Sequence, residues 1–166
     1  MSTLEGTETQ FPFRTAVEAR DLAAVADTFA PDAVLRSPLT GRFTFNGPEQ
    51  IAAVVKVLLD VCDDFHYTDE LRGRDGGFLV ARARVDGNDL EIVDHLRLDE
   101  NGKIREFTAF FRPMPAMPVA LRLMGAGLTR PKSETRAVVI SLLTRPLELM
   151  ARMGDAIGAR LVRPTL

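Results

Sequence analysis

The stretch Leu90-Glu91-Ile92-Val93-Asp94-His95-Leu96-Arg97-Leu98 decides the fold of this chain, because its residues alternate between two kinds. Successive residues of a β-strand point to opposite faces of a sheet. One face of this stretch therefore carries four aliphatic side chains and one carboxylate, at Leu90, Ile92, Asp94, Leu96 and Leu98. The stretch predicts a strand with one buried face, and Asp94 is the acid on that face.

Three further runs with the same period of two accompany this strand. We expect four strands, at about residues 65–72, 78–85, 90–98 and 104–112. The segments between them are Asp75-Gly76-Gly77, Asp86-Gly87-Asn88-Asp89 and Asn101-Gly102. Gly and Asn accept positive φ at low cost, which is typical of hairpin turns. Short hairpins join antiparallel neighbours, so the sequence predicts a four-stranded antiparallel meander.

Helical patterns precede the meander. One helix is expected from Pro12, and a second after Asp21, which is a good N-cap. A third begins at Gly47-Pro48, with apolar residues at a 3.6-residue period up to Cys62. Short strands are expected at 33–37 and 43–45. The order predicts an α+β fold in which helices cover one face of a curved antiparallel sheet.

Composition excludes several classes of protein. A net charge of −2 on 166 residues gives no case for nucleic-acid binding, and the sequence has no run of 18 apolar residues that would predict a membrane-spanning helix. Residues 1–10 are polar and are expected to be a flexible leader rather than a secretory signal. A single cysteine, Cys62, suits a reducing cytoplasm. The two histidines lack ligand spacing, so we expect neither a metal nor a cofactor.

Charge is divided unevenly along the chain. Residues 1–112 carry a net −7 and residues 113–166 a net +5, with Pro113, Pro115 and Pro118 at the join. We therefore expect a core domain at 1–112 and a helical extension at 113–166. In the extension, one helix is predicted from Ser133 and another from Pro146. The apolar stripes of residues 134–162 should pack against the core or a second subunit near the pocket. A membrane-surface contact is the less favoured alternative, and a flexible tail remains open.

Asp94 is the main candidate for a functional residue. A buried carboxylate finds a partner or keeps its proton, so the alternatives are a functional acid and a carboxylate satisfied within an ordinary core. Tyr67, the one tyrosine, is expected to point inward with Phe65 and Leu71 and could meet Asp94; the alternative is a tyrosine at the rim. Small residues such as Ala81 and Ala109 favour a cavity, although larger helix residues could fill it. The expected pocket lining is Phe13, Val17, Ser37, Leu58, Leu79, Ala81, Ile92, Leu96, Phe107, Ala109 and Phe111.

Four segments resemble the nuclear transport factor 2-like superfamily, and within it the SnoaL-like proteins and ketosteroid isomerases. They are Ala19-Arg20-Asp21-Leu22, Phe29-Ala30-Pro31-Asp32-Ala33-Val34, Asn46-Gly47-Pro48-Glu49-Gln50-Ile51 and the run from Val93 to Ile104. The resemblance covers residues 10–112. It implies a cone, formed by a bent sheet wrapped round a long helix, with a pocket at one end.

The same resemblance assigns roles to three positions. Asp94 falls where the isomerases keep a protonated aspartic acid that donates a hydrogen bond to an enolate oxygen. Phe13 stands where they have a catalytic tyrosine, and Ser37 where they have the general-base aspartate. A serine without a neighbouring base does not shuttle protons between carbons at neutral pH, which disfavours the steroid isomerase mechanism.

Two hypotheses about function follow. The first is a SnoaL-like protein that binds a small molecule in an apolar pocket. If it is catalytic, it is an isomerase, cyclase or lyase, and Asp94 and Tyr67 act on a carbonyl or hydroxyl oxygen of the substrate. The second is a non-catalytic interaction module that uses the outer sheet face and the C-terminal helices. In both cases we expect a homodimer and no nucleic-acid partner.

Overall fold

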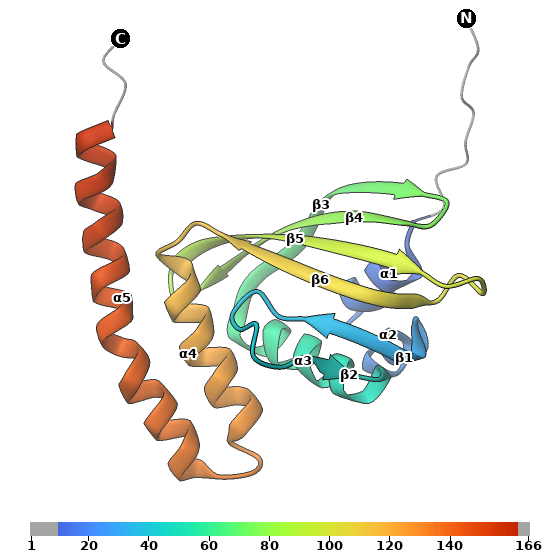
Figure 1. The fold of residues 1–166 in the computed structure, drawn as a ribbon, viewed down its shortest axis with the longest axis horizontal. Helices are drawn as coiled ribbons and strands as arrows, with labels where there is room; N and C mark the ends of the chain where they lie inside the picture. Colours follow the sequence, from blue (N-terminus) through green and yellow to red (C-terminus); the bar gives the residue numbers. More distant parts are fainter. Residues whose placement is uncertain (1–9, 163–166) are drawn as a thin grey trace, which may run out of the picture.

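The computed structural model describes residues 10–162 and shows a six-stranded curved sheet with helices along one face and two further helices at one end (Figure 1). In chain order the elements are α1 (Pro12–Glu18), α2 (Leu22–Asp27), β1 (Phe29–Arg36), β2 (Phe45–Asn46), α3 (Pro48–Val61), β3 (Cys62–Gly73), β4 (Gly76–Val85), β5 (Asn88–Leu98), β6 (Ile104–Arg112), α4 (Ala116–Thr129) and α5 (Glu134–Val162). The α+β fold predicted from the sequence is confirmed.

The sheet has the order β2-β1-β6-β5-β4-β3. Strands β3 to β6 pair antiparallel with their neighbours in the chain, which confirms the predicted meander. Strand β1 extends this meander by pairing parallel with β6, and β2 pairs antiparallel with β1. The β4–β5 turn contains Asp86 and Gly87, at φ values of 48° and 75°. This is the positive φ that the Asp-Gly turn was expected to accept.

Local signals explain where the first three helices begin. Pro12 and Pro48 occupy the first turns of α1 and α3, where a missing N–H costs little. The Asp21 side chain accepts a hydrogen bond from Ala24 N at 3.0 Å and so caps α2. These helices lie on the concave side of the sheet and leave its other side open (Figure 1).

The core lies between the concave face and helices α1 to α3. At its centre Phe13 of α1 packs edge-on against Phe29 and Phe107, with ring centroids 5.5 and 5.4 Å away. The buried hydrophobic residues of β4 are Leu79, Ala81, Ala83 and Val85, as the alternation predicted. Helix α4 adds Ala116, Val119 and Met124 to the same cluster. The extension therefore contributes to the core of the fold.

Strand β3 departs from the predicted alternation. Its pairing with β4 is irregular between Tyr67 and Asp69, so that Thr68 is an extra residue in the ladder. A bulge of this kind reverses the facing of every residue beyond it. Leu71, which was predicted to point inward, is 69% exposed, and the side chain of Glu70 is 13% exposed.

The extension also differs in detail from the prediction. Its residues 116–129 form a helix, α4, that we did not predict, and Pro118 lies in its first turn. The two helices predicted in 134–162 are one continuous helix, α5, with Pro146 inside it. Helical structure over 134–162 is confirmed. Within residues 10–162 no helix is long and apolar enough to cross a membrane.

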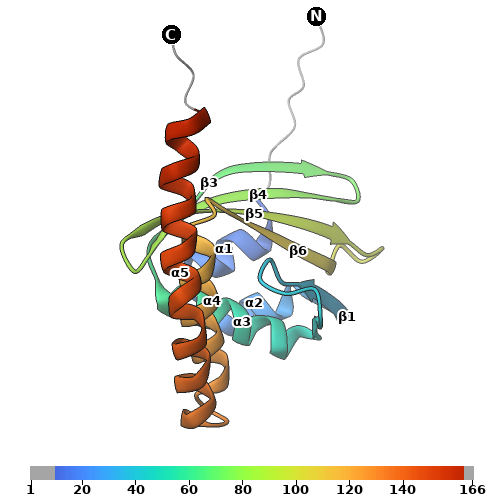
Figure 2. The same cartoon turned by 60° about the vertical axis from the view of Figure 1, so that its left-hand side comes forward.

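Helix α4 joins α5 to the rest of the chain. A Cβ built on Gly127 of α4 would lie 2.6 Å from Val57 of α3, and one on Gly125 would lie 3.0 Å from Ile140 of α5. Both glycines therefore permit a close helix approach. The guanidinium of Arg122 donates to Glu148 of α5 at 2.5 Å and to Asp86 at 2.7 Å. Helix α4 lies between α5 and the rest of the molecule (Figure 1), and in the turned view α5 stands in front of α4 (Figure 2).

Candidate functional site

Asp94 lies in the middle of β5, on the concave face of the sheet. Its neighbours across the two ladders are Leu79 of β4 and Ala109 of β6. The residue is 4% exposed. In the described part of the chain, the other buried residues with a hydroxyl, amide or charged side chain are Tyr67 and Thr144. The prediction that an acid points into an aliphatic face is therefore met by the geometry.

Tyr67 of β3 provides the hydrogen-bond partner of Asp94. The two side chains are hydrogen-bonded to each other, and Tyr67 is 6% exposed. Because the phenol O–H donates to the carboxyl group, this bond holds the pKa of Asp94 down, while burial raises it. Burial is the larger effect, and it raises the pKa of Asp94 from 3.8 to about 7. Burial and the nearby carboxylate raise the pKa of Tyr67 well above 10.

A charged layer formed by Arg14, Glu18 and Glu70 lies next to Tyr67. The guanidinium of Arg14 in α1 lies 5.8 Å from the centre of the Tyr67 ring and donates to the Tyr67 carbonyl at 3.4 Å. Glu70 accepts from Phe11 N at 2.6 Å and lies 3.5 Å from Arg14. Glu18 accepts from Arg14 at 3.1 Å. These contacts fix the start of α1 and the ring of Tyr67.

The sequence did not reveal this layer, because alternation placed Glu70 on the solvent side of β3. Only the bulge at Thr68 turns Glu70 inward, next to Arg14. The residues that form the bulge are ordinary strand residues, and nothing in their types indicates an irregular register.

The predicted lining residues fall into three groups. Eight lie with Tyr67 in one buried cluster: Phe13, Val17, Leu79, Ala81, Ile92, Leu96, Phe107 and Ala109. Leu58 and Phe111 are partly buried and pack against that cluster. Ser37 is outside it, just after β1, where its hydroxyl accepts from Leu39 N at 3.1 Å. That these residues line a pocket remains a prediction.

A half-open groove lies elsewhere, near the end of the sheet where β4 meets β5. Its volume is about 530 Å³, and its lining includes Arg82, Arg84, Glu91 and Arg112 but none of the predicted pocket residues. Glu91 is ion-paired with Arg82 at 3.6 Å and with Arg112 at 2.9 Å. Within residues 10–162 no group of three His, Cys, Asp or Glu side chains is placed to hold a metal ion.

The geometry of Asp94 suits one kind of chemistry. With a pKa of about 7, a large share of Asp94 is protonated at neutral pH, and a protonated carboxyl group is a hydrogen-bond donor. In a nonpolar environment such a donor stabilises negative charge that develops on an oxygen. The pair of Asp94 and Tyr67 is therefore suited to a carbonyl or enolate oxygen.

The SnoaL-like domain family matches residues 12–107, which is more than half of the chain. The chain belongs to this SnoaL-like family. Among solved structures it is similar to a steroid delta-isomerase from Pseudomonas aeruginosa, at 28% identity over 72% of this chain and 88% of that one, with a TM-score of 0.66. No curated protein matches the sequence.

Two further structures share the fold of this SnoaL-like chain. A protein with a cystatin-like fold from Silicibacter pomeroyi is 22% identical over 78% of this chain and 89% of its own, with a TM-score of 0.66. A nuclear transport factor 2-like protein of unknown function from Burkholderia xenovorans is 19% identical over 60% and 77%, with a TM-score of 0.53. At these identities the likeness concerns the fold alone. The resemblance of the sequence to SnoaL-like proteins is confirmed by the family match over residues 12–107.

Proposed function

We propose that this SnoaL-like protein binds a small apolar molecule through a carbonyl or hydroxyl oxygen and acts on it as an isomerase, cyclase or lyase. Protonated Asp94 donates a hydrogen bond to that oxygen and stabilises an enol or enolate, and Tyr67 holds the carboxyl group in place. The observation that carries the proposal is that Asp94 is buried among aliphatic residues and has a pKa of about 7.

The surroundings of Asp94 support this role over a purely structural one. A buried carboxyl group that serves only the fold gains by pairing with a cation or with several N–H groups, which lower its pKa. Arg14, whose guanidinium lies 5.8 Å from the centre of the Tyr67 ring, is instead paired with Glu18 and Glu70. Asp94 therefore keeps a raised pKa, as a general acid or a hydrogen-bond donor requires.

The likeness to the steroid delta-isomerase supports the class of chemistry but not the same proton transfer. A double-bond isomerisation needs a base that moves a proton between two carbons. Ser37 takes the place of that base according to the family resemblance, and its hydroxyl is engaged by the backbone N–H of Leu39. Phe13 packs edge-on against two other phenylalanine rings, Phe29 and Phe107. We therefore propose polarisation of a carbonyl by Asp94, with a substrate different from that of the isomerase.

A pair of matched probes tests the proposal. 1-Tetralone and tetralin share a bicyclic skeleton and differ in one carbonyl oxygen. We expect the wild-type chain to bind 1-tetralone about tenfold more tightly than tetralin, because a net hydrogen bond is worth about 1 kcal/mol or more. The variant Asp94→Leu should lose this preference while it keeps its affinity for tetralin. Equal affinities of the wild-type chain for both probes would refute the proposal.

A further inference from the structure

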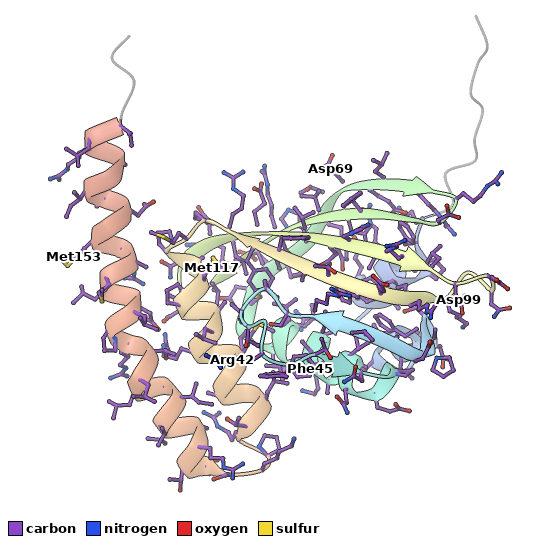
Figure 3. All side chains as sticks on the ribbon, viewed as in Figure 1. Arg42, Phe45, Asp69, Asp99, Met117 and Met153 are labelled. Carbon is purple, nitrogen blue, oxygen red and sulfur yellow. The ribbon has the colours of Figure 1, made fainter. Side chains whose placement is uncertain are left out.

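The outward face of α5 is apolar, which is unusual for a helix at the surface of a protein. Eleven of its Val, Leu, Met and Ile side chains are between 47% and 81% exposed, and all but Val162 lie on this face: Val138, Val139, Leu142, Leu143, Leu147, Leu149, Met150, Met153, Ile157 and Leu161. On a helix with 3.6 residues per turn they occupy one broad side. Met153 points away from the rest of the molecule (Figure 3).

The opposite side of α5 meets α4 and is the more polar one. Ala137 and Thr144 are buried there, and Glu148 binds Arg122 of α4. An amphipathic helix that packed only within its own chain would turn its apolar side inward. In α5 the arrangement is reversed, so the apolar side is free to meet something outside the chain. Exposed apolar patches of this size mark interaction surfaces.

Two glycines indicate that a helix covers this face. Gly154 and Gly158 lie inside α5, and a Cβ built on either would have no other group within 4 Å. Glycine in a helix interior is destabilising relative to alanine. The glycines of α4 show what such positions do in this chain, because Gly125 admits Ile140 and Gly127 admits Val57. A lipid surface does not need a glycine in this way, because no backbone has to approach the helix closely.

The geometry points to a second copy of this chain as the occupant, bound through antiparallel pairing of the two α5 helices. The contact is made by six residues that we call the α5 seam, spaced alternately by four and three along the helix: Leu143, Leu147, Met150, Gly154, Ile157 and Leu161. Alternation of three and four is the pattern by which two helices pack side by side.

The α5 seam is complementary to itself when the second helix runs in the opposite direction. With the two-fold axis crossing the α5 seam at the level of residue 152, Leu143 meets Leu161 of the second copy and Leu147 meets its Ile157. At the centre Met150 meets Gly154 of the second copy, so that the largest side chain lies opposite the missing one. The same surface patch serves both subunits, as a two-fold interface requires.

The area of the α5 seam corresponds to a small dimer interface. Its five side chains at about 100 Å² each supply about 500 Å² on each partner, or about 1,000 Å² in total, which is the size of a weak or transient interface. The α5 seam contains no charged residue. The charged residues Arg145, Glu148, Arg152 and Asp155 lie on the other side of the helix, where they stay in water or meet α4. Pairing therefore buries no unpaired charge from these residues.

Two neighbouring substitutions in the full-length protein test this inference. Met150 belongs to the α5 seam and is 68% exposed, whereas Leu149 lies off it and is 62% exposed. Sedimentation equilibrium should show that the wild-type chain self-associates, that Met150→Glu weakens self-association on the order of a hundredfold, and that Leu149→Glu changes it less than about twofold. Circular dichroism should show the same helix content in all three proteins.

Cysteine cross-linking tests the direction of the helices, because the one native cysteine, Cys62, is buried. A mixture of Met150→Cys and Gly154→Cys should form a disulfide-linked dimer, and Met150→Cys alone should not. Cross-linking of Met150→Cys with itself would overturn the antiparallel arrangement. The inference as a whole would be overturned by equal association of both glutamate variants, or by a monomeric wild-type chain that sediments with phosphatidylglycerol vesicles.

Discussion

Replacing Asp94 with asparagine should change how the stability of the fold depends on pH. The amide keeps the size of the carboxyl group and an oxygen that accepts from Tyr67, but it does not ionise. In the wild-type chain the pKa of Asp94 is about 7 when folded and 3.8 for an ordinary aspartate. Above pH 3.8 the unfolded chain therefore releases the proton more readily than the folded chain, and the free energy of unfolding falls as pH rises.

The size of this effect follows from the two pKa values. A tenfold change in an equilibrium is worth about 1.4 kcal/mol, so the penalty grows between pH 4 and pH 7 to about 4 kcal/mol. The whole free energy of unfolding of a domain is about 5–15 kcal/mol, so the loss is a large share of it. The free energy of unfolding of Asp94→Asn minus that of the wild-type chain should therefore be about 4 kcal/mol larger at pH 8 than at pH 4.

Urea denaturation at a series of pH values measures this difference. Asp69→Asn is the matched control, because Asp69 is exposed on the outer side of β3 (Figure 3). We expect the control to follow the wild-type pH dependence and Asp94→Asn to diverge from it above pH 4. Parallel curves for the wild-type chain and Asp94→Asn would refute the reasoning, since they would mean that Asp94 ionises equally well in both states.

Two further substitutions test individual contacts. Tyr67→Phe removes the hydrogen bond that holds the pKa of Asp94 down, so the pKa of Asp94 should rise above 7 when followed by NMR; an unchanged or lower value would contradict the assigned bond. Gly127→Ala places a Cβ 2.6 Å from Val57 and should destabilise the fold by about 1–3 kcal/mol. The control Gly41→Ala should not, because a Cβ on Gly41 has no group within 4 Å. Equal melting temperatures of the two variants would show that α3 and α4 separate easily.

Periodicity predicted the meander because each of its strands has one face in the core and one in solvent. It also identified Asp94, since a single acid among aliphatic residues breaks the pattern visibly. The pattern failed at Thr68, where a bulge changes the facing of Glu70 and Leu71. Strand register is set by pairing with β4, and a single strand's sequence does not contain that information.

The extension shows a different reason for failure. Pro118 was interpreted as part of a break and Pro146 as the start of a new helix, yet both lie within helices. Proline is tolerated in the first turn of a helix, where Pro118 stands, because the N–H there has no partner. For Pro146, packing of α5 against α4 through Arg122 and Glu148 outweighs the lost backbone bond. Contacts between distant elements decide such cases, and they are absent from local sequence patterns.

The carboxyl group of Asp94 provides the most direct measurement. In protein labelled with carbon-13 at aspartate carboxyl groups, with Asp94→Asn used to assign the signal, the account predicts a titration midpoint near 7. Saturation with 1-tetralone should raise that midpoint, because a hydrogen bond donated by the neutral acid to the ketone oxygen favours the protonated form. A midpoint near 3.8, or one that saturating 1-tetralone leaves unchanged, would contradict the assignment of Asp94 as the group that binds the ligand oxygen.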